Sequence, residues 1–284
     1  MGRGVDPADG RQLEGLLGRH RITLQHRLGQ NFLIDPALRG AIADASGAGP
    51  DDEVLEVGAG VGTLTIALAA RSRRVVGVEF DRALIPALRE VLTGHVNVEV
   101  VQADILRFDV EAAFPRGGEI VAGNIPYNLT GALIRKLLDR PPRPRRLSLV
   151  VQKEVAERWA ATTSASLGTV AVQVFAEPRI VMSIPASSFT PPPKVDSALV
   201  ILEVRPRPAV EVPDVVEFLR FVEEVFQFRR KQVGGTLARL SGLTGPDVAA
   251  RLQELGIEAA RRPQTLTLSE WERIYGALNS KTAR

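Results

Sequence analysis

Two short stretches of the chain carry the groups that chemistry on a nucleobase requires. Asn124-Ile125-Pro126-Tyr127 supplies a side-chain amide, backbone carbonyls beside a proline and an aromatic ring. Upstream, Glu56-Val57-Gly58-Ala59-Gly60-Val61-Gly62 is a glycine-rich turn, in which the backbone can approach a ligand without a Cβ in the way. The first stretch could hold a flat base with an exocyclic amine, and the second suits a nucleoside cofactor. Together they predict methyl transfer from S-adenosylmethionine to the amino nitrogen of an adenine.

The first stretch matches the needs of that reaction. An adenine amino nitrogen is a weak nucleophile because its lone pair is delocalised into the ring, and acceptors on both N–H groups favour a tetrahedral nitrogen. The side-chain oxygen of Asn124 can accept one N–H, and the Ile125 carbonyl, directed by Pro126, can accept the other. Tyr127 can stack on the base. Positioning supplies most of the rate of such a displacement, so no strong base is needed, although the tetrapeptide could also be an ordinary polar turn.

A second aromatic residue could face the same base. Phe189 precedes Thr190-Pro191-Pro192-Pro193-Lys194, whose three prolines preset a rigid extended loop. Such a loop could hold Phe189 against the second face of the base. A core phenylalanine beside a structural turn explains the sequence equally well.

The cofactor hypothesis rests on Gly58 and Gly60, in the turn after the first predicted strand, and on two acidic residues. Glu79 closes the second strand. It follows the glycine turn by about the number of residues at which a carboxylate binds ribose hydroxyls in nucleotide-binding folds. Asp104 follows the third strand, where it could accept from an adenine amino group. Taken singly, the turn could bind nothing, Glu79 could be an exposed carboxylate and Asp104 a turn cap. A dinucleotide fingerprint needs a third glycine where Thr63 stands, which disfavours an NAD-dependent dehydrogenase.

The composition limits which other chemistries are possible. The chain has no cysteine, so disulfides, thiolate zinc sites and cysteine nucleophiles are excluded. The histidines, His20, His26 and His95, show no metal-ligand spacing, and we expect no metal site. No apolar run approaches the roughly 20 residues that span a bilayer, and the N-terminus lacks the pattern of a secretory signal. We therefore expect a cytoplasmic protein with no membrane contact.

From Glu53 onward, short apolar strands alternate with single helices, which indicates a parallel sheet covered on both faces. The predicted strands are Glu53–Val57, Arg74–Glu79, Asn97–Gln102, Glu119–Ala122, Leu147–Val151, Ile180–Ile184 and Ser197–Val204. Ligands of such folds bind at the carboxyl ends of the strands, where the glycine turn, Glu79, Asp104 and Asn124 all fall. The predicted fold class is therefore α/β with a Rossmann-like sheet, followed by a small C-terminal helical domain.

The two ends of the chain differ from this central pattern. Residues 1–27 are predicted to be a flexible lead-in with one short helical turn at most. Residues 28–204 form the predicted catalytic domain, and 205–213, which begins Arg-Pro-Arg-Pro, is predicted to be a stiff linker. Residues 214–284 show helical patterns, the last of which begins with Ser269 as its predicted N-cap.

Basic residues are grouped along the chain, with a net charge of only +3 and a pI of about 9.6. The groups are Arg19, Arg21 and Arg27; Arg140, Arg143, Arg145 and Arg146; Arg229, Arg230 and Lys231; and Arg261 and Arg262. Local positive patches attract polyanions more than net charge does, although some groups could be solvated helix ends.

The motifs together resemble those of the small-subunit ribosomal RNA adenine dimethyltransferases, the KsgA-type enzymes. The resemblance runs from about Leu28 to about Leu240. It rests on Gly29-Gln30-Asn31-Phe32-Leu33, Glu56-Val57-Gly58-Ala59-Gly60, Asn124-Ile125-Pro126-Tyr127-Asn128, Gln152-Lys153-Glu154-Val155-Ala156-Glu157-Arg158, Phe189-Thr190-Pro191-Pro192-Pro193-Lys194-Val195-Asp196-Ser197 and Phe228-Arg229-Arg230-Lys231.

This resemblance implies an S-adenosylmethionine-dependent methyltransferase sheet that dimethylates N6 of two adjacent adenines near the 3′ end of small-subunit rRNA, during ribosome biogenesis. It implies cofactor contacts from Asn31, Leu33, Gly58, Glu79, Asp104 and Asn124. It also implies target-base contacts from Tyr127 and Phe189. Arg229, Arg230, Lys231 and the helical domain would hold rRNA phosphates, and we expect the protein to act as a monomer.

Two rival functions stay open on the sequence. The related large-subunit rRNA adenine dimethyltransferases share the Asn-Ile-Pro-Tyr site, although the Pro191–Ser197 segment is more similar to the small-subunit type. A ribosome-assembly factor or nucleic-acid clamp could keep the fold without catalysis. Loss of Glu79, Asp104 or Asn124 would favour the clamp, and all three are present.

Overall fold

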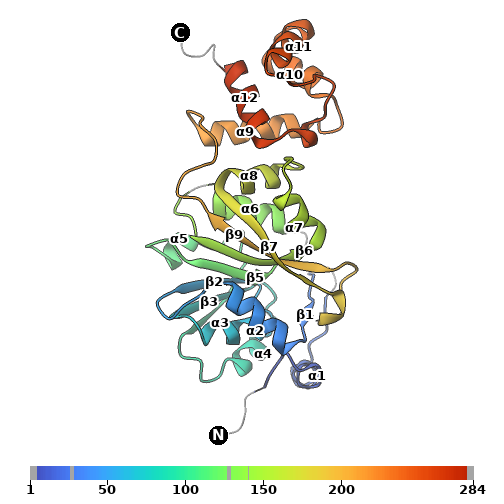
Figure 1. Ribbon diagram of the computed structural model, residues 1–284. Coiled ribbons are helices and arrows are strands. Elements are labelled where there is room, and N and C mark those ends of the chain that lie inside the picture. The colour runs from blue at the N-terminus through green and yellow to red at the C-terminus, as the bar shows by residue number, and fades with distance from the viewer. Residues whose placement is uncertain (1–4, 26–28, 127–128, 140, 280–284) are drawn as a thin grey trace. The chain divides into compact units, whose positions relative to one another are not determined.

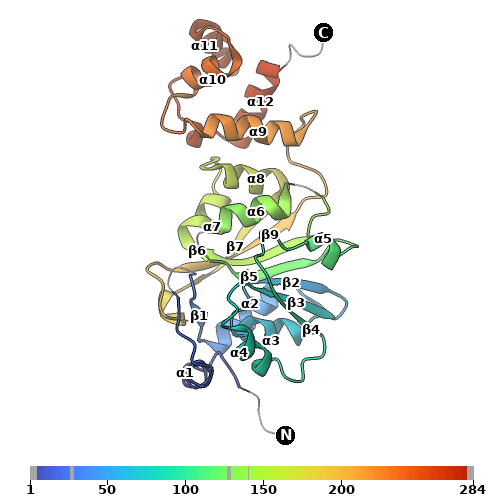
Figure 2. The same cartoon turned by 180° about the vertical axis from the view of Figure 1, so that it is seen from behind.

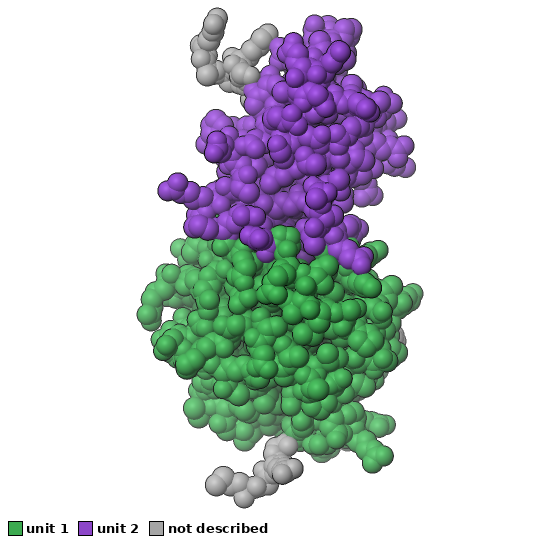
Figure 3. Space-filling view, in the orientation of Figure 1, with its two compact units in different colours: residues 1–156, 178–204 green, residues 157–177, 205–284 purple. Residues whose placement is uncertain are grey.

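The computed structural model describes residues 5–25, 29–126, 129–139 and 141–279 (Figure 1). The chain divides into two compact units, which Figure 3 colours separately. Unit 1 comprises residues 1–156 and 178–204, and unit 2 comprises residues 157–177 and 205–284. Each unit is described by itself.

The described part of unit 1 is built on a seven-stranded sheet. Its order is β4 (Val98–Gln102), β3 (Arg74–Glu79), β2 (Glu53–Val57), β5 (Ile120–Asn124), β6 (Arg146–Gln152), β9 (Ser197–Val204) and β7 (Ala176–Ile184). The first five strands pair in parallel, and β9 runs antiparallel to β6. The predicted bounds of β2, β3 and β9 are confirmed, and the expected α/β sheet is present.

Helices cover both faces of this sheet. The helices that lie or begin in unit 1 are α1 (Gly10–Arg19), α2 (Pro36–Ala45), α3 (Thr63–Ala69), α4 (Ile85–Val91), α5 (Val110–Ala113), α6 (Thr130–Leu138) and α7 (Lys153–Ala160). Figures 1 and 2 show α2, α3 and α4 on one face and α6 on the other. Strands covered in this way are apolar on both sides, as the sequence pattern indicates.

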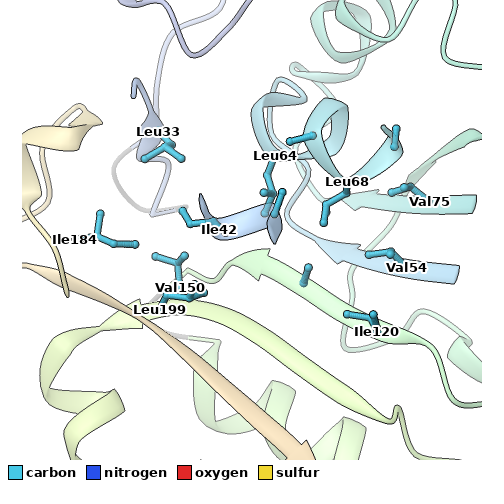
Figure 4. Close-up of a cluster of buried hydrophobic side chains, with 14 of the residues drawn as sticks. Leu33, Ile42, Val54, Leu64, Leu68, Val75, Ile120, Val150, Ile184 and Leu199 are labelled. Carbon is cyan, nitrogen blue, oxygen red and sulfur yellow. The ribbon is translucent and has the colours of Figure 1, made fainter. Parts of the chain in front are cut away.

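One hydrophobic core of unit 1 joins α2 and α3 to the sheet. Ile42 of α2 and Leu64 and Leu68 of α3 lie over strand residues such as Val54 and Ile120 (Figure 4). Leu33 and Phe189 belong to the same cluster, so two segments outside the sheet are anchored to its core.

A two-stranded antiparallel sheet joins these two segments to each other. It pairs β1 (Phe32–Leu33) with β8 (Phe189–Thr190), which follows the 3-10 helix η2 (Ala186–Ser188). The register places Leu33 opposite Phe189. Two of the predicted motifs, far apart in sequence, are thereby brought side by side.

The short turn expected near the N-terminus is a ten-residue helix, α1. The carboxylate of Asp9 caps it by accepting from the backbone N–H groups of Arg11 and Gln12. Leu13 and Leu16 are buried in a cluster with Phe32 and other residues of unit 1. The glycines of the lead-in obscured this apolar stripe, and tertiary packing stabilises the helix.

Unit 2 consists mainly of helices: α8 (Leu167–Phe175), α9 (Val215–Phe226), α10 (Val233–Ser241), α11 (Gly245–Glu254), the 3-10 helix η3 (Pro263–Thr265) and α12 (Leu268–Asn279). Phe221 of α9 lies edge-on to Trp271 and Tyr275 of α12. Residues 157–177 group with these helices, whereas the sequence analysis assigned them to the domain 28–204. The domain boundaries stay a prediction.

The predicted N-cap of the last helix is wrong. Ser269 lies inside α12, and the hydroxyl of Thr267 accepts from the backbone N–H of Glu270 at 3.2 Å. The Glu270 carboxylate in turn accepts from the backbone N–H of Thr267 at 2.8 Å. This reciprocal capping box satisfies two N–H groups at once, which favours Thr267 over Ser269 as the start. Among the helices of the described residues, none has both the length and the apolar character to cross a membrane.

Candidate cofactor and target-base site

A cavity of about 320 Å³ opens in unit 1 at the carboxyl ends of the parallel strands. The predicted site residues that line it are Asn31, Leu33, Gly58, Gly60, Glu79, Asp104, Asn124, Pro126 and Phe189. Ile125 is buried directly beside it, with 1% of its surface exposed. Tyr127 lies outside the described residues. The structure therefore brings together residues from six separate segments in one site.

The glycine turn forms one wall of the cavity. Gly58 and Gly60 both have positive φ, at 75° and 59°, which favours glycine. A Cβ at Gly60 would come within 3.2 Å of the Phe32 ring, so the turn and the segment above it are in close contact. The backbone N–H of Gly60 donates to Oε2 of Glu79 at 2.8 Å.

Glu79 is held in place by main-chain donors. Besides the bond from Gly60, its Oε1 accepts from the backbone N–H of Asp81 at 2.7 Å. Burial raises the pKa of this carboxyl, and the two N–H groups oppose that shift. A carboxylate has about four acceptor sites, so two fixed donors leave others for the hydroxyls of a ligand.

The cavity also contains polar atoms for which the described residues provide no partner. Oε2 of Glu56 and the hydroxyl of Thr63 are buried and make no hydrogen bond. Burial, with a smaller contribution from the charge of Glu79, raises the pKa of Glu56 from 4.5 to about 8. Buried polar groups are normally paired, so unpaired ones beside a cavity fit a ligand that carries hydrogen-bonding groups. With its ammonium and ribose hydroxyls, S-adenosylmethionine is such a ligand.

Asp104 lines the cavity and also caps a turn. Its Oδ1 accepts from the backbone N–H of Leu106 at 2.9 Å, and Oδ2 lies 3.9 Å from Nε of Arg107. The turn-cap alternative is thus correct for one oxygen, and the other remains available to a ligand. The apolar lining residues that were not identified from the sequence include Phe80, which is 56% exposed, and Ile105. Each directly follows a predicted acidic residue, and this position in the sequence could have identified both as lining residues.

Asn124 ends β5, and its side chain has a fixed orientation. Nδ2 donates to the backbone carbonyl of Asn31 at 2.9 Å, which leaves Oδ1 as a free acceptor. The next backbone N–H, that of Ile125, donates to Val150 at 3.0 Å. Among the described residues, no backbone N–H donates to the Ile125 carbonyl. Two acceptors therefore stand at adjacent positions beside the cavity.

Phe189 is a core residue, which is one of the two alternatives that the sequence left open, and its contact with a base stays a prediction. It is only 3% exposed and packs in the core cluster with Leu33 and Ile184. It also lines the cavity. In the part of the chain that the structure describes, no group of three metal-ligating side chains comes together.

Two of the basic groups are largely bonded within the protein. Arg145 pairs with Asp52 at 2.7 Å and Arg146 with Glu203 at 2.6 Å. Arg140 and Arg27 lie outside the described residues. Arg19 pairs with Glu90. Arg19, Arg145 and Arg146 are thus engaged in ion pairs and are poor candidates for an open nucleic-acid surface.

Arg229, Arg230 and Lys231 differ, because they are exposed and no carboxylate of the described residues pairs with them. They precede α10, whose first backbone N–H, from Val233, donates to the Arg261 carbonyl at 2.7 Å. That bond brings the exposed Arg262 close to the same helix start, while the Arg261 guanidinium pairs with Glu270. Unit 2 thus presents a group of unpaired cations.

Two solved structures are similar to this chain over most of its length. A 23S rRNA methyltransferase, ErmE, is 32% identical, with a TM-score of 0.69 over 88% of this chain and 100% of that one. A dimethyladenosine transferase from Plasmodium falciparum is 25% identical, with a TM-score of 0.71 over 87% of this chain and 97% of that one. The α/β fold is that of Rossmann-like S-adenosylmethionine-dependent methyltransferases.

Sequence relatives agree with the structural ones. Ribosomal RNA small subunit methyltransferase A of Pelotomaculum thermopropionicum is 43% identical over 91% of this chain and 92% of its own length. The protein of the same name from Shouchella clausii is 36% identical over 99% of this chain and 98% of its own length. The family described as ribosomal RNA adenine dimethylase matches residues 21–279. Because the match spans nearly the whole chain, this protein belongs to the ribosomal RNA adenine dimethylase family.

Proposed function

We propose that N6 dimethylation of adenine takes place in the cavity of unit 1, where Asn124 and Ile125 accept hydrogen bonds from the target amino group. The chain is a KsgA-type enzyme that methylates small-subunit rRNA and uses S-adenosylmethionine. The observation that carries the assignment of residues is the bond from Nδ2 of Asn124 to Asn31. Because Nδ2 already donates to Asn31, Oδ1 is free to accept one N–H of the adenine.

The cofactor-binding roles follow from the groups that line the cavity. The carboxylate of Glu79 would accept from the ribose hydroxyls, and Asp104 would accept from the adenine amino group of the cofactor. Gly58 and Gly60 would let the backbone approach it, while Asn31 and Leu33 would cover its methionine end. When bound, S-adenosylmethionine supplies an electrophilic methyl group. Phe80 and Ile105 offer apolar surface for a flat ring.

The target adenine would be held by the opposite side of the site. Oδ1 of Asn124 and the Ile125 carbonyl would accept its two N–H groups, which favours a tetrahedral nitrogen with its lone pair free. Pro126 would direct the chain at that point, and Tyr127 and Phe189 would contact the faces of the base. Positioning of this kind supplies most of the rate acceleration without a general base.

RNA would be held partly by unit 2. The exposed cations Arg229, Arg230 and Lys231 would contact rRNA phosphates, an interaction that weakens with salt. The finer parts of the proposal are two adjacent adenines near the 3′ end as targets, action as a monomer during ribosome biogenesis, and a cytoplasmic location.

The test is methyl transfer from labelled S-adenosylmethionine to small ribosomal subunits that lack the modification, with large subunits and DNA in parallel. Nucleoside digestion identifies the product. We expect dimethyladenosine from small subunits only, and no product with Asn124→Ala. Label on large subunits would instead support the second candidate, suggested by the 32% identity to the 23S rRNA methyltransferase. Cofactor binding without transfer to any substrate would point to an assembly intermediate as the true substrate. Absence of both transfer and cofactor binding would support a non-catalytic assembly factor.

A further inference from the structure

Residues 29–34, here called the strap, contribute several lining residues to the cavity. The C-terminal end of the strap is fixed by main-chain bonds. Phe32 and Leu33 pair with β8, and the backbone N–H of Ile34 donates to the Ser188 carbonyl at 2.9 Å. This end is therefore held by the β1–β8 sheet, independently of strap side chains.

The N-terminal end of the strap is fixed by one side chain, that of Gln30. Its Nε2 donates to Oδ2 of Asp81 at 2.6 Å, and its Oε1 accepts from the backbone N–H of Gln25 at 2.7 Å. Asp81 is a rigid partner, because its Oδ1 accepts from the backbone N–H of Ala83 at 2.9 Å and its own N–H donates to Glu79. Both ends of the Gln30 amide are thus engaged at a nearly buried site.

Asn31 lies between these two attachments. Its carbonyl accepts the bond from Nδ2 of Asn124 at 2.9 Å, and this bond decides which way the planar amide of Asn124 faces. The neighbouring Gly29 is also close to the catalytic segment, since a Cβ at Gly29 would lie 3.3 Å from Cβ of Pro126. The strap therefore touches two residues of the Asn124–Pro126 segment.

We propose that Gln30 is a positioning residue for methyl transfer: by its bond to Asp81 it holds the Asn31 carbonyl where that carbonyl orients Asn124. This inference rests on the proposed function, in which Oδ1 of Asn124 accepts from the target amino group. Gln30 acts through Asn31 and Asn124 and contributes no group to the chemistry itself.

The geometry separates this role from cofactor binding. The Glu79 carboxylate is held by the backbone N–H groups of Gly60 and Asp81, and neither bond needs the Gln30 side chain. Removal of that side chain therefore leaves the glycine turn and Glu79 in place. Of the proposed cofactor contacts, only those of Asn31 and Leu33 depend on the strap. Loss of Gln30 should therefore slow the transfer step more than it lowers the affinity for the cofactor.

The first experiment compares Gln30→Ala with the unchanged full-length chain. Methyl transfer to unmodified small subunits gives kcat, and calorimetry with S-adenosylmethionine gives Kd. Because displacement of a reacting group by about 1 Å can cost about 100-fold, we expect kcat to fall ~10- to 100-fold, with Kd changed less than about 3-fold. Gln12→Ala is the matched control, since Gln12 also accepts a backbone N–H bond, from Asp6 at 3.0 Å, and lies on α1. Its kcat should be unchanged.

The second experiment reverses the hydrogen bond. Gln30→Glu places a carboxylate against Asp81 and should lower kcat at least as much as Gln30→Ala, because like charges repel at this distance. Adding Asp81→Asn restores a donor–acceptor pair in the opposite direction. We expect the double variant to recover most of kcat, which a merely structural contribution of Gln30 would not predict.

The outcomes separate the inference from the proposed function. Full activity of Gln30→Ala, or a fall in cofactor affinity that matches the fall in kcat, overturns the inference. If Gln30→Ala does not fold, the double variant decides: recovery supports the inference, and a folded but inactive double variant overturns it. Activity retained by Asn124→Ala overturns the proposed role of Asn124 itself, whereas loss there with full activity in Gln30→Ala overturns the inference alone.

Discussion

The side-chain amide of Asn124 donates to the backbone carbonyl of Asn31 across 2.9 Å, so a residue at the end of β5 is oriented by a segment near the N-terminus. The chemistry proposed for Asn124 needs its oxygen, and this bond occupies its nitrogen. Two properties of one side chain, its position and its rotamer, thus have separate structural origins. The sheet sets the position, and the strap sets the rotamer.

Asn124→Asp should impair catalysis more than cofactor binding. An ionised carboxylate cannot donate to the Asn31 carbonyl and is repelled by it, so the side chain should rotate away. We expect kcat to fall by about 10- to 100-fold, with Kd for S-adenosylmethionine changed by less than about 3-fold. Single-turnover methyl transfer and calorimetry measure the two quantities. A kcat equal to that of the unchanged chain would show that the Asn31 bond does not matter.

Glu79→Gln should weaken cofactor binding. The substitution removes the charge that strengthens hydrogen bonds from hydroxyl and N–H donors, and charged hydrogen bonds contribute about 1.5–3 kcal/mol. We expect Kd to rise about 10- to 100-fold in calorimetry. Glu99→Gln, on the adjacent strand β4 and paired with Arg74, is the matched control and should bind normally. Equal affinities for both variants would remove Glu79 from the cofactor site.

Gly123→Ala should destabilise the protein and disturb Asn124. A Cβ there would lie 2.4 Å from the Val57 carbonyl, so β5 must shift away from the end of β2. Overpacking of this kind costs about 1–3 kcal/mol, which thermal unfolding measures. The control is Gly131→Ala, where a Cβ meets nothing within 4 Å on α6. That substitution should be neutral or stabilising, because alanine favours helix over glycine.

Glu56→Gln should change how stability depends on pH in the absence of cofactor. The folded-state pKa of Glu56 is raised from 4.5 to about 8 by burial. Between these values the unfolded chain loses the proton and the folded one keeps it. Stability therefore falls as pH rises, by ~1.4 kcal/mol per unit from this group. The contribution is complete below about pH 4.5 and is lost as the pH passes the folded-state pKa.

Urea unfolding between pH 5 and 8 tests this prediction. Glu56→Gln should be markedly more stable than the unchanged chain near pH 8, with the difference shrinking toward pH 5. The exposed Glu111, changed to Gln, serves as a control and should follow the unchanged chain. Parallel curves for Glu56→Gln and the unchanged chain would mean that Glu56 is paired or solvated in the folded state.

The double variant Arg229→Ala/Arg230→Ala should weaken RNA binding in a salt-dependent way. Each lost phosphate contact should lower the slope of log K against log salt by about one. The expected loss is the same for different RNA sequences, and cofactor binding should not change. Arg11→Ala/Arg116→Ala removes the same charge from exposed positions in unit 1. Equal salt slopes for the two double variants would argue against unit 2 as an RNA-binding surface.

Local patterns in the sequence determined much of this site. The apolar strands and the glycine turn predicted an α/β sheet, and the bounds of β2, β3 and β9 agree with the structure. Because parallel strands end at one edge, the acidic and amide residues that follow them were predicted to share a cavity, and Glu79, Asp104 and Asn124 do line one. These predictions needed only periodicity, chain direction and the chemistry of each side chain.

Tertiary structure alone decided the rest, since it depends on contacts between distant segments. No local pattern shows that the Asn31 carbonyl meets Asn124, that Gln30 meets Asp81, or that the β1–β8 sheet places Leu33 opposite Phe189. The N-terminal helix was underestimated for the same reason, because its apolar stripe is stabilised only by the cluster that buries it. The local sequence thus determines the chemistry of each side chain, whereas the orientation of each group is set by segments that meet only when the chain is folded.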